Sequence, residues 1–176
     1  MNIAKLIYTI PIYLKEKGEI AKECYRGEGD IVEPLGAYFK NLRRHAFLRE
    51  YYESNPYIEL YVDKIYESAN GDAQTFKWLF TKTLIHELAH AVLDNYNLSK
   101  LNRHITKLRY NSEFIKRREE SMANAIELKV IKEFGDKDFY NYARFFMLTQ
   151  PAEYALGVSM EDFDYGDLRS VMDNKY

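Results

Sequence analysis

The segment TKTLIHELAHAVLDN, residues 81–95, constrains the fold more than any other part of the sequence. Apolar residues recur through it at helical spacing, and Asp72 in front of it is a suitable N-cap. We therefore predict one long helix that ends near Tyr96. This helix carries two of the chain's four histidines, His86 and His90. Residues four apart on a helix project from the same side, so both imidazoles should point at one position in space.

The five residues HELAH within this segment have the order of a helical zinc site. Two imidazoles supply two ligands of a tetrahedral ion, and Glu87 lies about 100° around the helix from His86. Glu87 is then close enough to act on a zinc-activated water without binding the zinc itself. The sequence predicts His86 and His90 as zinc ligands and Glu87 as the general base. The alternative is a helix whose two histidines bind no metal.

A hydrolytic zinc site needs a third protein ligand, which we expect from a second long helix at about residues 112–134. Glu120 falls within the apolar arc of this helix, where an acid is rare unless it is paired or binds metal. We expect Glu120 to bind the zinc and Asn124, one turn later, to accept a hydrogen bond from the far nitrogen of a ligand histidine. Glu119 and Glu127 are the alternative ligands.

The motif HELAH, followed by ESMAN at residues 120–124, resembles the gluzincin class of zincin metallopeptidases. ESMAN is similar in particular to the third-ligand helix of the IrrE/ImmA-type metallopeptidases. The resemblance covers about residues 57–134 and departs after Asn124, where the chain continues IELKV. It implies an α+β class and a compact zincin-like domain, with a small antiparallel sheet packed on the HExxH helix and the third-ligand helix. It also implies an edge strand, Tyr57 to Val62, that pairs with extended substrate.

The remaining elements are predicted from local patterns. Ile58, Leu60 and Val62 alternate with polar and aromatic residues, which predicts a half-buried strand. Around Ile10 the pattern suits a strand or a helix. We further expect a short strand at 35–40, a helical insertion at 43–52, a helix at 136–148 and a short helix begun by Pro151.

A donor to the oxyanion is the missing part of a peptidase site. We favour Tyr154, on the short helix after Pro151, as this catalytic residue. Tyr140, Tyr142 and Arg144 are the alternatives.

Composition indicates the number of domains, the cellular compartment and the classes of partner. The chain has 176 residues, a net charge of -2 and one cysteine, Cys24. We expect a single domain over residues 1–176, in the cytoplasm, with no intrachain disulfide. The charge favours neither nucleic acid nor a membrane surface as a partner, and no apolar run approaches the roughly 20 residues that cross a bilayer. Cys24 fits a small buried hydrophobe better than a thiolate that caps the zinc.

The sequence thus predicts a zinc-dependent metallopeptidase acting on a protein or peptide substrate, with Zn2+ as its cofactor. The rival predictions are a regulatory or protein-binding module that keeps the zinc without turnover, and a helical protein without metal. The sequence indicates no oligomeric state.

Overall fold

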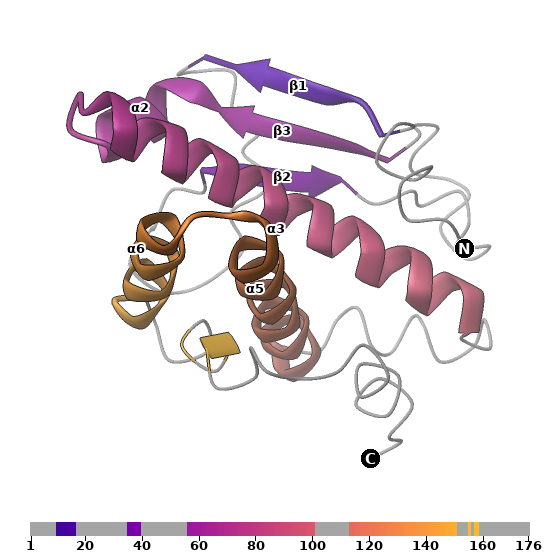
Figure 1. Cartoon of the computed structure of the whole chain (residues 1–176). Helices are drawn as coiled ribbons and strands as arrows, with labels where there is room; N and C mark the ends of the chain where they lie inside the picture. Colours follow the sequence, from indigo (N-terminus) through magenta and orange to yellow (C-terminus); the bar gives the residue numbers. More distant parts are fainter. Residues whose placement is uncertain are drawn as a thin grey trace.

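The computed structural model describes residues 10–16, 35–39, 56–100 and 113–150, together with Ala155, Gly157 and Val158. These residues form an α+β fold, as predicted (Figure 1). The predicted helical insertion at 43–52, Cys24 and Tyr154 lie outside the described residues. The elements, in chain order, are β1 (Ile12–Lys15), β2 (Gly36–Phe39), β3 (Tyr57–Tyr61), α2 (Val62–Ser68), α3 (Ala73–Lys100), α5 (Glu113–Phe134) and α6 (Lys137–Leu148).

The described sheet is mixed, with the strand order β1-β3-β2. β1 runs parallel to β3, with Ile12 opposite Ile58, and β2 runs antiparallel to β3, with Gly36 opposite Leu60. The prediction of an antiparallel sheet was therefore wrong for β1. The prediction that residues 57–62 form an edge strand was also wrong, because β3 has a partner on each side.

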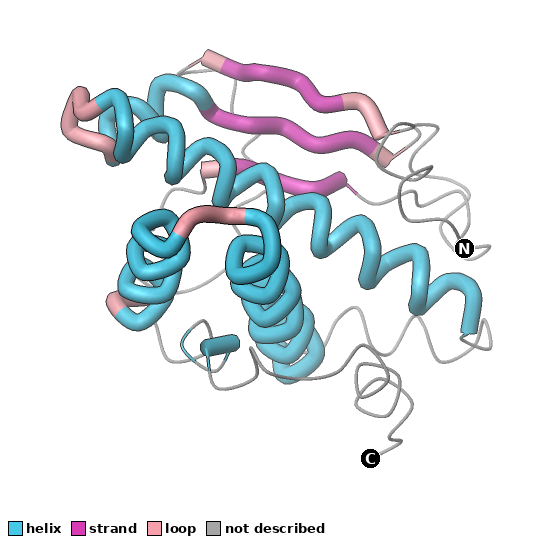
Figure 2. The backbone as a smooth tube through the Cα atoms, in the orientation of Figure 1, coloured by secondary structure: helices cyan, strands magenta, loops and turns pink. Residues whose placement is uncertain are grey.

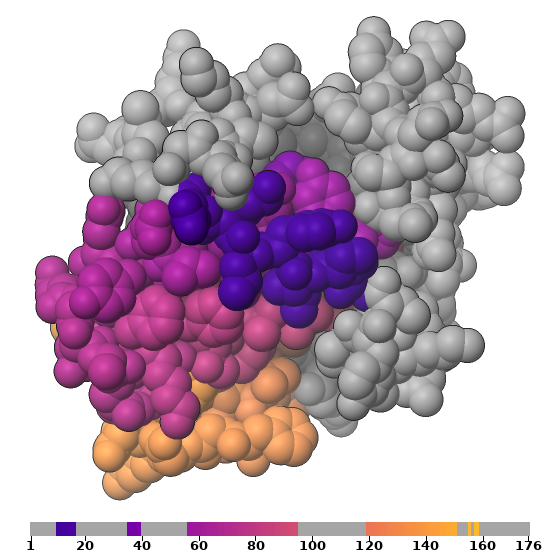
Figure 3. All heavy atoms as spheres, turned by 90° about the horizontal axis from the view of Figure 1, so that it is seen from above, coloured from indigo at the N-terminus to yellow at the C-terminus, as the bar shows by residue number. Residues whose placement is uncertain are grey.

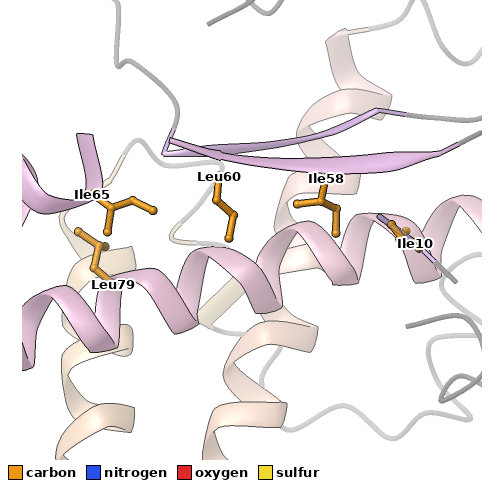
Figure 4. Close-up of a cluster of buried hydrophobic side chains, with 6 residues drawn as sticks. Ile10, Ile58, Leu60, Ile65 and Leu79 are labelled. Carbon is orange, nitrogen blue, oxygen red and sulfur yellow. The ribbon is translucent and has the colours of Figure 1, made fainter. Parts of the chain in front are cut away.

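The burial of β3 also differs from the prediction of a half-buried strand. Ile58 and Leu60 point toward α3 (Figure 4), and Glu59 and Tyr61 of the opposite face are buried as well. The hydroxyl of Tyr61 donates to a carboxylate oxygen of Glu59 at 3.2 Å. Both faces of β3 are therefore covered, which alternation alone does not reveal. The strand ends at Tyr61, and Val62 already begins α2.

Helix α3 lies between the sheet and the helices α5 and α6 (Figures 1 and 2). On the sheet side, the core consists of buried aliphatic side chains from β3, α2, α3 and the segment just before β1 (Figure 4). Burying each isoleucine or leucine of this core contributes about 1.5–3 kcal/mol. This core fixes which side of α3 faces the sheet and so which side faces α5. The buried residues of this core are Ile10, Ile58, Leu60, Ile65, Leu79 and Ala91.

The start of α3 follows from local chemistry. Asn70 and Gly71 both have positive φ, 52° and 74°, which turns the chain sharply after α2. The Asp72 carboxylate then accepts a hydrogen bond from the backbone N–H of Thr75 at 2.6 Å. This confirms Asp72 as the N-cap. The helix ends at Lys100, a turn later than predicted.

Helices α5 and α6 are joined by a short turn (Figure 2). Asp136 caps α6 by accepting from the backbone N–H of Phe139 at 2.7 Å. Small residues, Ala89 of α3 and Ala123 of α5, are buried between their helices and allow close approach. In the part of the chain that the structure describes, no helix has both the length and the hydropathy to cross a membrane.

Candidate metal centre

The candidate site lies where α3 and α5 face each other. The contacts run in opposite directions along the two helices, so the helices are antiparallel. Along α3, Lys82 and then His86 approach Glu127, and His86 and His90 both approach Glu120. The long helices predicted from caps and periodicity therefore bring the predicted ligands His86, His90 and Glu120 together.

One donor atom from each predicted ligand forms a small triangle. Nε2 of His86 lies 3.1 Å from Nε2 of His90 and 3.3 Å from Oε2 of Glu120, and the third side is 3.4 Å. Ligands bound tetrahedrally at about 2.0–2.1 Å lie about 3.3 Å from one another. Two imidazole nitrogens and one carboxylate oxygen also form a donor set typical of catalytic zinc. Both the spacing and the chemistry of the three residues fit a zinc ion.

The electrostatics of the triangle favour a cation. Burial alone lowers the pKa of His86, but Glu120 and Glu127 outweigh it and raise that pKa to about 9. Burial likewise opposes the proton on His90, yet Glu120 and Glu119 raise its pKa well above the usual value. For Glu120, burial raises the pKa, and the attraction of His90 and His86 overcomes this and lowers it. Carboxylates that hold protons on imidazoles also favour a metal cation in the same place.

Of the three predicted ligands, Glu120 is the most exposed. The Glu120 side chain is 31% exposed, whereas those of His86 and His90 are 14% and 10% exposed. Solvent therefore reaches the triangle most readily at Glu120. A catalytic site needs such an open position beside its three protein ligands.

Glu87 is held from the sheet side of α3. Its carboxylate is buried and accepts a hydrogen bond from the backbone N–H of Tyr38 in β2. The Tyr38 hydroxyl donates to Asp94 at 3.1 Å, two turns further along the same side of α3. Burial raises the pKa of Glu87, and the charges of His86 and His90 oppose that rise. Glu87 is thus fixed close to the triangle without being part of it.

The far nitrogens of the histidines face carboxylates, in the role that we expected Asn124 to fill. Nδ1 of His86 lies 3.2 Å from Oε2 of Glu127, and Nδ1 of His90 lies 3.3 Å from Oε1 of Glu119. The two alternative ligands therefore contact the outer side of the imidazoles. Asn124 is buried where Gly157 packs on α5, since a Cβ on Gly157 would meet the Asn124 Cβ at 2.5 Å.

Two alternative oxyanion donors belong to the core. The rings of Tyr142 and Trp78 are 5.4 Å apart, and Tyr140 packs in the same apolar cluster. Burial raises the pKa of Tyr142. Arg144, the third alternative donor, is exposed on α6.

Lys82, Tyr38 and Asp94 contact the site or its neighbours, and sequence reasoning did not single them out. One sequence feature could have pointed to Lys82. It lies four residues before His86 and therefore shares the side of α3 that faces α5.

Comparison with protein-family models, with characterised proteins and with solved structures found no match to this chain.

Proposed function

We propose that this chain is a zinc-dependent metallopeptidase with a zincin-like site. The observation that carries the proposal is the triangle of donor atoms, whose sides of 3.1, 3.3 and 3.4 Å match the spacing of tetrahedral zinc ligands. Its ligands are His86, His90 and Glu120. A general base, Glu87, follows His86 directly on the same helix.

When bound, zinc supplies Lewis-acid chemistry, which acidifies a water and polarises a peptide carbonyl. Glu87 takes the proton of the attacking water and delivers it to the leaving amine. Its buried position raises its pKa, which makes the carboxylate a stronger base for the first transfer. The backbone N–H of Tyr38 holds the carboxylate in one orientation for both transfers.

The strand beside the base is β2. We therefore assign the pairing with extended substrate to β2 in place of β3. β2 is at an edge of the described sheet, and its Tyr38 contacts both Glu87 and Asp94. A peptide added along that edge would run past the carboxylate that must reach the scissile bond.

The test combines zinc content with cleavage of a proteome-derived peptide library. Glu87→Gln keeps the size of the side chain and leaves the three ligands intact, so zinc should stay at one per chain. Hydrolysis should fall by about 100- to 10,000-fold because the base is lost. Glu133→Gln, on the exposed end of α5, is the matched control and should cleave as fast as wild type.

Two results would contradict the proposal. A Glu87→Gln variant that cleaves the same peptide at the wild-type rate would refute the role of the base. A zinc-loaded wild type that cleaves no peptide in the library would instead support a zinc-binding module without hydrolytic activity.

A further inference from the structure

Glu127 is the most deeply buried acid beside the site. Its side chain is 0% exposed, and its carboxylate lies between two groups of α3. On one side, Nζ of Lys82 is 3.2 Å from Oε1 and 3.3 Å from Oε2. On the other side, Nδ1 of His86 is 3.2 Å from Oε2. Lys82 and His86 are one helical turn apart, so Glu127 spans that turn from the facing helix.

Lys82 is itself almost completely enclosed. Its side chain is 9% exposed, and its ammonium lies 4.8 Å from the centre of the Phe146 ring of α6. A buried lysine and a buried carboxylate are each strongly disfavoured alone, and they are tolerated when they neutralise each other. Residues from α3, α5 and α6 therefore meet at this one ion pair.

The carboxylate of Glu127 faces the nitrogen of His86 that points away from the donor triangle. The contact is short but not aligned as a hydrogen bond, and Nδ1 of His86 has no aligned partner. The distance is already that of a hydrogen bond, so a change in ring orientation is enough to align it. With the proton at Nδ1 bonded to Glu127, the lone pair at Nε2 is directed into the triangle.

We propose that Lys82 and Glu127 are a positioning pair for the metal ligand His86: Lys82 fixes the Glu127 carboxylate, and this carboxylate orients the imidazole. The inference rests on the proposed zinc site and adds two residues that do not touch the metal. His90 has a counterpart in Glu119, whose side chain is more exposed, at 15%.

The direction in which Lys82→Met changes the zinc affinity separates positioning from a simple charge effect. If Lys82 acted only as a positive charge near the metal, Lys82→Met would strengthen the binding of a divalent cation. If Lys82 fixes Glu127, the same change should weaken zinc binding. Glu127→Gln should weaken it by about 10- to 100-fold, as expected for loss of a partner behind a ligand histidine.

The experiment measures zinc affinity by chelator competition, the visible absorption of the Co2+-loaded protein and the melting temperature of the metal-free protein. Lys82→Met and Glu127→Gln should both lower zinc affinity and change the Co2+ spectrum. Lys77→Met, an exposed lysine on the same helix, is the control and should change neither.

The double variant, Lys82→Met with Glu127→Gln, distinguishes positioning from folding. Removing both charges should restore the melting temperature that Lys82→Met loses, because no buried charge remains unpaired. Zinc affinity should nevertheless stay as low as in Glu127→Gln. A double variant with wild-type zinc affinity would overturn the inference, as would tighter or unchanged binding in Lys82→Met.

These readouts separate the inference from the peptidase proposal. Wild type that binds zinc but cleaves nothing refutes the peptidase and leaves the positioning pair standing on its affinity data. Wild type that binds no zinc refutes both.

Discussion

At the scale of single residues, the interface between α3 and α5 places oppositely charged groups next to each other. Glu120 faces two imidazoles, Glu119 faces one, and Glu127 lies between an imidazole and Lys82. Buried charges persist only with such partners. In the metal-free protein, protons on the histidines complete this pattern, because the carboxylates raise the pKa of both imidazoles.

Zinc must therefore displace protons when it binds. Below pH 9, His86 is protonated in the metal-free protein, since its pKa is raised to about 9. The neighbouring carboxylates also raise the pKa of His90 well above its usual value. At pH 7 we expect at least one proton to be released per zinc bound. Calorimetry in buffers of different ionisation enthalpy measures this number. Apparent zinc affinity should rise with pH and level off near pH 9; an affinity that is flat from pH 6 to 9 would be evidence against the assignment.

At the scale of elements, α6 supports the site from behind through Phe146, which lies over Lys82. The helix begins at Asp136, whose carboxylate accepts from the backbone N–H of Phe139. Its inner face, with Phe139, Ala143 and Met147, is buried against α5 and α3.

The N-cap of α6 gives a stability prediction. Asp136→Ala removes the acceptor for an otherwise unpaired N–H, so the free energy of unfolding should fall by about 1 kcal/mol. Asp138→Ala, an exposed acid in the first turn of the same helix, should change it by less than about 0.5 kcal/mol. Urea denaturation of the two variants measures the difference. Equal effects would mean that the cap contributes no more than a surface charge.

The long helices could be predicted from the sequence because their signals are local. Asp72 caps α3, and Asp136 stands at the start of α6, as their sequence positions indicated. The short helix α2 was missed, because the seven residues Val62–Ser68 are too few to show a period. The strand pairings were also missed, since β3 finds its partners in segments far away in the chain.

Part of the site could be predicted for the same reason, and part could not. HELAH places His86 and His90 by helix geometry alone, and Glu120 was found from its position on the apolar arc of α5. A helical wheel puts Asn124 and Glu127 on the same arc, so it could not decide which of them reaches a histidine. Lys82 finds its partner 45 residues away on another helix, and no local pattern signals such a pair.

At the scale of the whole molecule, α3 contacts both the sheet and the helical layer. The candidate site lies on this shared helix, with Tyr38 of β2 on one side and Glu120 of α5 on the other. A metal held there would join α3 to α5 in the folded state only, since the ligands come from separate parts of the chain.

Zinc should therefore raise the melting temperature. Free zinc at 100 times its dissociation constant stabilises the folded state by about 2.7 kcal/mol. In a chain of this size that corresponds to about 5–10 °C. Differential scanning calorimetry with and without zinc measures the shift, and His86→Ala should show little of it. An equal shift in His86→Ala would mean that zinc stabilises the protein from another place.

The edge strand β1 has a consequence for the way the folded chain opens. β1 joins β3 across the whole segment between Lys15 and Tyr57, and its side chains are exposed at the surface (Figure 3): Ile12 41%, Tyr13 49% and Leu14 61%. Pairing β1 with β3 closes a long loop, which costs entropy, and it buries little side-chain area in return. We therefore expect β1 to detach most readily of the three strands under native conditions. Its departure uncovers the backbone of the apolar strand β3, which can then pair with another chain. Slow aggregation on mild heating would therefore start at this edge, while the helices α3 and α5 are still folded.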